Sequence, residues 1–121
     1  MDEPTTTGQQ GEQLARSYLL RQGLRFITSN YRSRRGEIDL IMRDGNALVF
    51  IEVRYRRPSS FGGGLDSISL RKQRRLIAAA LHYLQSLPGN PPACRFDIIA
   101  IDGERPEDGR ITWLQNVIEH H

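Results

Sequence analysis

The chain has 121 residues, enough for one domain with a single core but too few for a catalytic domain plus a separate binding domain. Its formal charge is only +3, and its 17 basic residues include a single lysine, Lys72. One cysteine excludes an internal disulfide, and no apolar run approaches the roughly 20 residues of a membrane helix. Together with the polar, acidic first residues, these features predict a cytoplasmic protein.

Residues 1–8 are expected to form a disordered leader and residues 9–119 a single domain. From Gln9, apolar residues recur at helical spacing ahead of Gly23, which predicts an amphipathic helix with a glycine C-cap. A strand is expected over residues 24–31, followed by a basic turn. Strands are also expected over 37–43 and 47–55, because the Asp-Gly step between them is a hairpin signal.

The second half of the chain begins with a glycine-rich loop at 58–65, which lacks the Gly-Lys-Ser/Thr ending of a phosphate loop. A second helix is expected to begin near Ser67 or Ser69, with Lys72 solvated. Its expected buried stripe comprises Leu70, Ile77, Leu81 and Leu84, with Leu76 and Ala80 beside them. Strands are expected at 95–102 and 110–117. This order predicts an α/β sandwich, with a mixed central sheet flanked by helices.

The arginines are clustered, whereas four acidic residues lie together late in the chain, namely Asp102, Glu104, Glu107 and Asp108. The basic clusters are Arg32, Arg34 and Arg35, then Arg54, Arg56 and Arg57, then Arg71, Lys72, Arg74 and Arg75. The planar arginine side chain suits bidentate contact with phosphate, so the clusters favour a nucleic-acid partner. The alternative explanation is a GC-rich coding sequence, which also favours arginine.

Side chains alternate between the two faces of a strand. On the 37–43 strand, alternation predicts one face with Glu37, Asp39 and Ile41, and an opposite face with Ile38 and Leu40. On the 47–55 strand, the two predicted faces are Phe50, Glu52 and Arg54 against Val49, Ile51 and Val53.

Glu52 lies in a strongly apolar strand that we expect to be central and covered. A carboxylate there is costly unless a cation neutralises it. Asp39 and Glu52 are placed to share Mg²⁺ or Mn²⁺, ions that prefer hard oxygen ligands, and the carbonyl of Val53 is a further candidate ligand. The alternative is a structural network in which both carboxylates only pair with Arg54 and a neighbouring arginine.

Two helical residues are open to both structural and functional interpretations. Glu12 shares a helix face with Ala15 and Leu19, so it is either directed inward or a solvated acid in the first turn. Gln73 lies four residues before Ile77 and either orients water or phosphate or is a plain surface residue.

The order of these motifs resembles the restriction-endonuclease-like superfamily, whose active site is an Asp followed, on the next strand, by Glu/Asp-x-Lys. The span from Gly11 to about Ile118 is most similar to the bacterial YraN family, relatives of archaeal Holliday-junction resolvases. The matching motifs are Gly11-Glu12-x-x-Ala15, Asn30-Tyr31-Arg32, Gly36-Glu-Ile-Asp39-Leu-Ile41, Phe50-Ile-Glu52-Val53, Arg71-Lys72-Gln73 and Phe96-Asp97.

The resemblance implies a metal-dependent nuclease fold with Glu12, Asp39 and Glu52 as metal ligands. Arg54 stands at the lysine position of the superfamily. Arginine keeps its charge at any accessible pH, so it can stabilise charge on a phosphate but cannot act as a base. Either a bound metal activates water instead, or the site has lost catalysis and kept binding.

Three functions therefore remain open. The first is a resolvase-like DNA endonuclease, in which Arg54 contacts the scissile phosphate and Gln73 orients it. The DNA, whether branched, duplex or single-stranded, would be held by Arg32, Arg34, Arg35, Arg56, Arg57 and Arg75. The second is a non-catalytic nucleic-acid-binding module, and the third is a protein-interaction domain whose carboxylates only neutralise arginines. The resemblance to resolvases also implies a homodimer.

Overall fold

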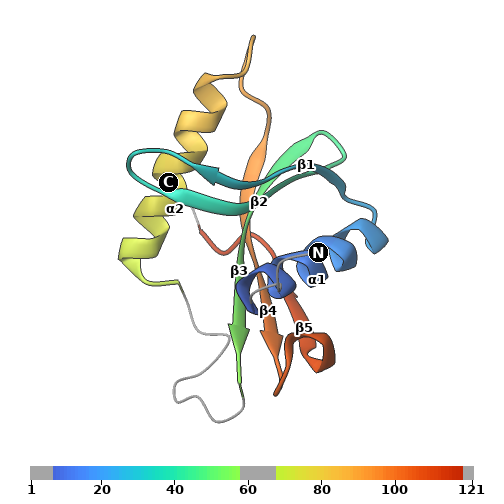
Figure 1. Ribbon diagram of the computed structural model, residues 1–121. Helices are drawn as coiled ribbons and strands as arrows, with labels where there is room; N and C mark the ends of the chain where they lie inside the picture. Colours follow the sequence, from blue (N-terminus) through green and yellow to red (C-terminus); the bar gives the residue numbers. More distant parts are fainter. Residues whose placement is uncertain (1–6, 58–67, 119–121) are drawn as a thin grey trace, which may run out of the picture.

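The structure, a computed structural model, describes residues 7–57 and 68–118. Two helices and five strands follow the predicted order of helix, three strands, helix, two strands (Figure 1). The elements are α1 (Thr7–Arg21), β1 (Arg25–Arg32), β2 (Glu37–Asp44), β3 (Ala47–Arg56), α2 (Leu70–Gln85), β4 (Cys94–Asp102), the short 3-10 helix η1 (Pro106–Asp108) and β5 (Arg110–Leu114). Helix α1 begins two residues before its predicted start. The rest of the predicted leader and the glycine-rich loop lie outside the described residues.

The five strands form one mixed sheet in the order β1-β2-β3-β4-β5. Strands β3 and β4 pair in parallel, and the other neighbours pair antiparallel. A parallel pair needs a crossover connection, which the segment containing α2 supplies. The prediction that β3 is central is confirmed.

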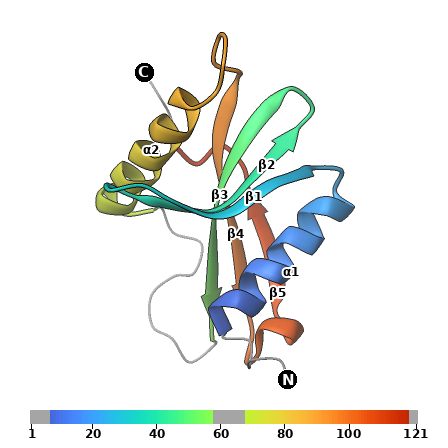
Figure 2. The same ribbon diagram turned by 45° about the horizontal axis from the view of Figure 1, so that its top comes forward.

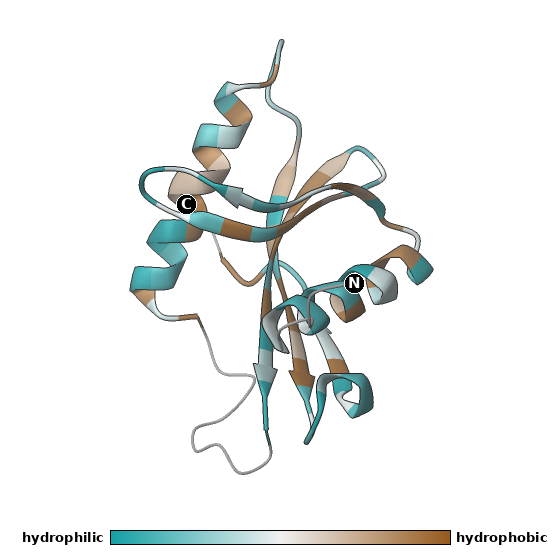
Figure 3. Ribbon diagram, in the orientation of Figure 1, coloured by the Kyte–Doolittle hydropathy of each residue, from teal (hydrophilic) through white to brown (hydrophobic). Residues whose placement is uncertain are grey.

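The two helices cover opposite faces of the sheet (Figures 1 and 2). Helix α1 buries Ala15 and Leu19 against one face, and α2 buries Leu76 and Ala80 against the other. Figure 3 shows hydrophobic residues on the strands between the helices and hydrophilic residues over most of the first half of α2. The predicted α/β sandwich is confirmed. Neither of these two helices is long and apolar enough to cross a membrane.

The predicted N-cap of α2 is confirmed at Ser69, whose Oγ accepts a hydrogen bond from the backbone N–H of Lys72 at 3.2 Å. The predicted buried stripe is wrong at Leu70 and Leu81, which are 67% and 54% exposed. Both leucines lie on one side of a helix of about 3.6 residues per turn. The opposite side carries the small Ala79, which is fully buried and lets the helix approach the sheet closely.

Alternation of side chains fails in β2 around Asp39. Ile38 packs in the cluster beneath α2, whereas Leu40 packs in the cluster beneath α1, so the predicted shared face is wrong. Asn30 lies across from Asp39 in the β1–β2 register and has a left-handed backbone with φ of 54°. A left-handed residue interrupts the regular pleat of a strand pair, and strict alternation of side chains along the strand does not anticipate this interruption.

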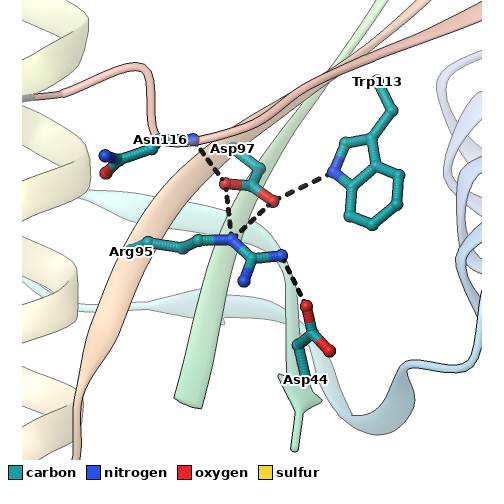
Figure 4. A network of polar contacts seen from close by, with 5 residues as sticks. All are labelled: Asp44, Arg95, Asp97, Trp113 and Asn116. Carbon is teal, nitrogen blue, oxygen red and sulfur yellow. Dashed lines mark hydrogen bonds and ion pairs between the residues drawn. The ribbon is translucent and has the colours of Figure 1, made fainter.

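Asp97 is 1% exposed and is the only charged residue, among the described residues, that is almost completely buried. Its carboxylate accepts hydrogen bonds from Arg95 Nε at 3.1 Å, Trp113 Nε1 at 2.9 Å and the backbone N–H of Asn116 at 2.9 Å (Figure 4). Arg95 also pairs with Asp44 at 3.0 Å. The chain turns at Asn116, with φ of 56°, so β5 ends before the predicted limit at residue 117.

Gly36 lets the β1–β2 turn lie directly on the backbone of α2. A Cβ atom at Gly36 would be 1.8 Å from the carbonyl oxygen of Arg75. Glu37, the next residue, pairs with Arg32 at 3.7 Å and with Arg75 at 3.9 Å. Two arginine clusters that are far apart in the sequence are thereby brought together.

Replacing Asp97 by alanine is expected to lower the free energy of unfolding by about 3–5 kcal/mol, because it leaves a part-buried guanidinium, an indole N–H and a backbone N–H without their acceptor. Urea denaturation measures the change. Glu104→Ala, at an exposed position, is the control and is expected to change stability by less than about 0.5 kcal/mol. A loss at Asp97 as small as that of the control would contradict this account.

Gly36→Ala and Gly11→Ala are expected to change stability in opposite directions. At Gly36 the added methyl group meets the α2 backbone, so we expect a loss of about 2 kcal/mol or more. At Gly11 the nearest atoms lie at 3.8–4.0 Å, and alanine favours the helix by about 1 kcal/mol, so the melting temperature should rise. Both variants are measured by thermal and urea unfolding. If Gly36→Ala changed stability in the same direction and by the same amount as Gly11→Ala, the Gly36 contact would not be tight.

Candidate functional site

Glu12 and Asp39 line one pocket of about 380 Å³ on the α1 side of the sheet. Helix α1 supplies Glu12, which is half-buried, and β2 supplies Asp39. The remaining lining residues are Gly8, Gln9, Gly11, Asn30, Arg32, Val53 and Tyr55. Two of the three predicted metal ligands therefore meet in one cavity.

Asp39 stands where β2 separates from β3. Strand pairing ends with Leu40 opposite Ile51, and the Asp39 Oδ2 atom accepts a hydrogen bond from the backbone N–H of Val53 at 2.8 Å. Beyond this pair, β2 no longer offers a backbone carbonyl to the N–H of Val53, and the side chain of Asp39 accepts that hydrogen bond instead. Within the described residues, no lysine, arginine or histidine lies within ion-pair distance of Asp39.

Burial raises the pKa of Asp39 from 3.8 to about 6. The hydrogen bond from Val53 lowers this pKa, and the nearby carboxylates of Glu12, Glu52 and Glu37 raise it further. Ionised Asp39 is therefore costly in the protein alone. A cation in the pocket would relieve both the burial of this charge and the repulsion from its neighbours.

Glu52, the third predicted ligand, lies on the α2 side of β3. Its side chain is 14% exposed and pairs with Arg54 Nε at 3.5 Å and with Lys72 Nζ at 3.7 Å. Its Oε2 atom is buried and accepts no hydrogen bond within the described residues. Glu52 thus has the cationic partners that the structural interpretation of the site expects, whereas Asp39 has none among residues 7–57 and 68–118.

A second pocket, of about 480 Å³, lies beside Glu52. Val53 and Tyr55 border both pockets, and the other lining residues of the second one are Arg54, Arg56, Ser69 and Lys72. The first turn of α2 contains no acidic residue that would offset the positive end of the helix. The second pocket is therefore cationic and suits a phosphate group.

The prediction for Lys72 was incomplete. The side chain is 56% exposed but ion-paired with Glu52 and part of the cationic pocket. The prediction that Gln73 orients phosphate finds no support in its contacts. Gln73 Nε2 donates to the carbonyl of Ile68 at 2.8 Å, and the residue lines neither pocket. It holds the chain at the start of α2.

The six predicted DNA-binding arginines fall into three groups. Arg32 and Arg75 lie around Glu37, and Arg32 also lines the pocket of Glu12 and Asp39. Arg56 lines the cationic pocket. The remaining three are exposed, namely Arg34, Arg35 and Arg57.

Asn30 and Tyr55 are pocket residues that sequence reasoning missed. Asn30 Nδ2 donates to Glu12 Oε2 at 3.1 Å, and the Tyr55 hydroxyl donates to the carbonyl of Gly103 at 2.7 Å. In the sequence, Tyr55 has no feature that distinguishes it from an ordinary strand residue. An asparagine inside a predicted strand is a weak signal, because asparagine is depleted in strands and enriched at left-handed positions.

Among the described residues, no three Asp, Glu, His or Cys side chains gather as a ready ligand set. Magnesium is commonly held by one or two protein carboxylates and keeps several waters. Glu12 and Asp39, as two hard oxygen donors in one pocket, fit an ion of this kind. Glu52 lies close enough to raise the pKa of Asp39 but is held by its own cations.

The raised pKa of Asp39 predicts that stability falls as pH rises from about 4 to about 7. In this range the folded protein binds more protons than the unfolded chain, so ionisation favours unfolding by up to about 3 kcal/mol. Asp39→Asn keeps an acceptor for the Val53 N–H but cannot ionise. The variant should match wild type near pH 4 and exceed it at pH 8 in metal-free urea denaturation. A difference that is independent of pH would contradict the assignment.

Comparison with known proteins agrees with the motifs. Residues 11–101 match the family model described as "Uncharacterised protein family UPF0102". A UPF0102 protein of Nitrosococcus oceani is 56% identical over 111 residues, covering 90% of this chain and 88% of the relative. UPF0102 proteins of Janthinobacterium sp. (strain Marseille) and Coxiella burnetii are 53% and 52% identical, each over 93% of this chain and over 86% and 91% of their own lengths. The chain therefore belongs to the UPF0102 family, the YraN-type family that its motifs resemble.

Proposed function

We propose that this protein is a nucleic-acid-binding endonuclease that hydrolyses DNA phosphodiesters with Mg²⁺ or Mn²⁺. The observation that carries the proposal is the meeting of Glu12 and Asp39 in one pocket, beside a second pocket lined by cations. The first pocket suits a divalent ion, and the second suits a phosphate. Val53 and Tyr55 of β3 border both pockets.

In this proposal Asp39 and Glu12 hold the ion, and Glu52 stays beside them as the partner of Arg54. A bound divalent ion supplies an activated water and charge relief on the phosphate. Arg54 donates hydrogen bonds to phosphate oxygens as negative charge grows there, and its fixed charge excludes it as a general base. Gln73 acts through the start of α2 and does not contact the phosphate.

The arginines form the proposed DNA surface. The contact of Gly36 with α2 joins the β1–β2 turn to the basic first half of α2, so their arginines lie on neighbouring elements. We propose that the DNA backbone is held by Arg32, Arg34, Arg35, Arg56, Arg57 and Arg75. Such contacts release counterions, so binding should weaken steeply as salt rises.

A non-catalytic nucleic-acid-binding module is the second candidate. The observation that favours it is the pairing of Glu52 with both Arg54 and Lys72. A carboxylate that is already neutralised by two cations is a weaker ligand for a metal ion. This candidate keeps the arginine surface and the cationic pocket but predicts no turnover.

The test is cleavage of a four-way junction, a flap, a duplex and single strands by the full chain, with Mg²⁺ or Mn²⁺. Wild type is expected to cut at least one substrate. Asp39→Asn is expected to lose about 100-fold or more, because it removes a ligand whose ion stabilises charge by several kcal/mol. Glu104→Gln removes one exposed negative charge at a residue that lines neither pocket, and it should retain full activity.

Binding is measured on the same substrates between low and moderate salt. Salt-sensitive binding without cleavage would leave the binding module as the function. The absence of both cleavage and binding would overturn the nucleic-acid proposal altogether. Equal activity in Asp39→Asn and wild type would place catalysis elsewhere.

A further inference from the structure

Asn30 has a backbone conformation that strand pairing does not require. It is in β1 and lies across from Asp39, because its neighbours Ser29 and Tyr31 pair with Leu40 and Ile38 of β2. Its φ is 54°, in the left-handed region that residues with a Cβ seldom adopt. Asparagine tolerates this region better than most residues, so the position has a reason to be asparagine.

The Asn30 side chain ends on the carboxylate of Glu12. Its Nδ2 donates to Glu12 Oε2 at 3.1 Å across 18 positions of sequence, from β1 to α1. An ionised carboxylate only accepts hydrogen bonds, so the amide must present its NH₂ group. Within the described residues, this is the one hydrogen bond found for the Glu12 carboxylate.

Without a partner, a glutamate on a helix samples several rotamers, and fixing one of them costs conformational entropy. Asn30 supplies that partner from the wall of the same pocket that Asp39 lines. The left-handed backbone and the hydrogen bond to Glu12 belong to the same residue, which lies opposite Asp39.

We propose that Asn30 is a positioning residue, which holds the carboxylate of Glu12 in the pocket so that Glu12 and Asp39 bind one divalent cation together. The proposal rests on the metal site of the proposed function and adds a residue to it. Residues that orient metal ligands by hydrogen bonds typically affect metal affinity by about 10–100-fold. Asn30 is not itself a ligand in this proposal.

The test is the affinity of the full chain for Mn²⁺, measured by isothermal titration calorimetry with Mn²⁺ alone at pH 8. Asn30→Gly removes the amide but keeps the backbone conformation, because glycine adopts positive φ freely. The variant is expected to bind Mn²⁺ about tenfold more weakly. Glu12→Gln should lose at least as much, and the double variant should lose no more than Glu12→Gln alone.

Asn116→Gly is the matched control. Asn116 is the other non-glycine residue of the described chain with positive φ, and its backbone N–H, which glycine retains, makes the contact with Asp97. This variant loses the same side chain at the same kind of backbone position, away from the pocket. It should bind Mn²⁺ as wild type does. Circular dichroism of all variants at the assay temperature checks that they are folded.

Wild-type affinity in Asn30→Gly would overturn the positioning role while leaving the metal site in place. An additive loss in the double variant would also overturn it, because Asn30 would then act independently of Glu12. Wild-type protein that fails to bind Mn²⁺ would instead overturn the metal site of the proposed function, and the role of Asn30 with it. A structural role alone would lower stability without this coupling to Glu12.

Discussion

The hydrogen bond from the backbone N–H of Val53 to Asp39 is the interaction on which the candidate site depends. It forms where β2 separates from β3, so the Asp39 side chain, and not a backbone carbonyl of β2, accepts the hydrogen bond from Val53. The exchange keeps the N–H satisfied but places the Asp39 carboxylate in a part-buried position among other carboxylates. Burial raises the pKa of Asp39 to about 6, although the hydrogen bond itself lowers it. Near neutral pH, the ionised Asp39 carboxylate beside Glu12 makes the pocket suited to a cation.

Strand β3 separates two sites of opposite character. Its alternation directs Glu52 and Arg54 toward α2, whereas the backbone N–H of Val53 donates to Asp39, which lines the pocket beneath α1. The α1 side is acidic through Glu12 and Asp39, and the α2 side is cationic. A ligand that combines a divalent cation with a phosphodiester matches both sides, and this match is the physical basis of the proposed function.

Most of the fold could be predicted from the sequence because its signals are local. Ser69 caps α2, Gly23 ends α1 with φ of 98°, and Gly45 turns the hairpin with φ of 60°. These residues act through their own backbone and need no distant neighbour. The errors at Leu70 and Leu81 arise because several sides of α2 carry leucine or isoleucine, and only contact with the sheet selects one of them.

The sequence by itself determined the order of elements, the mixed sheet and the shared face of Glu52 and Arg54, because β3 is regular and central. It also placed Asp39 and Glu12 among the candidates. Only the tertiary structure decided that Glu12 meets Asp39, while Glu52 pairs with Arg54 and Lys72. The reason is geometric. The partner of a carboxylate depends on which helix covers each face of the sheet and on where two strands separate. Neither of these two features produces a periodic pattern in the sequence.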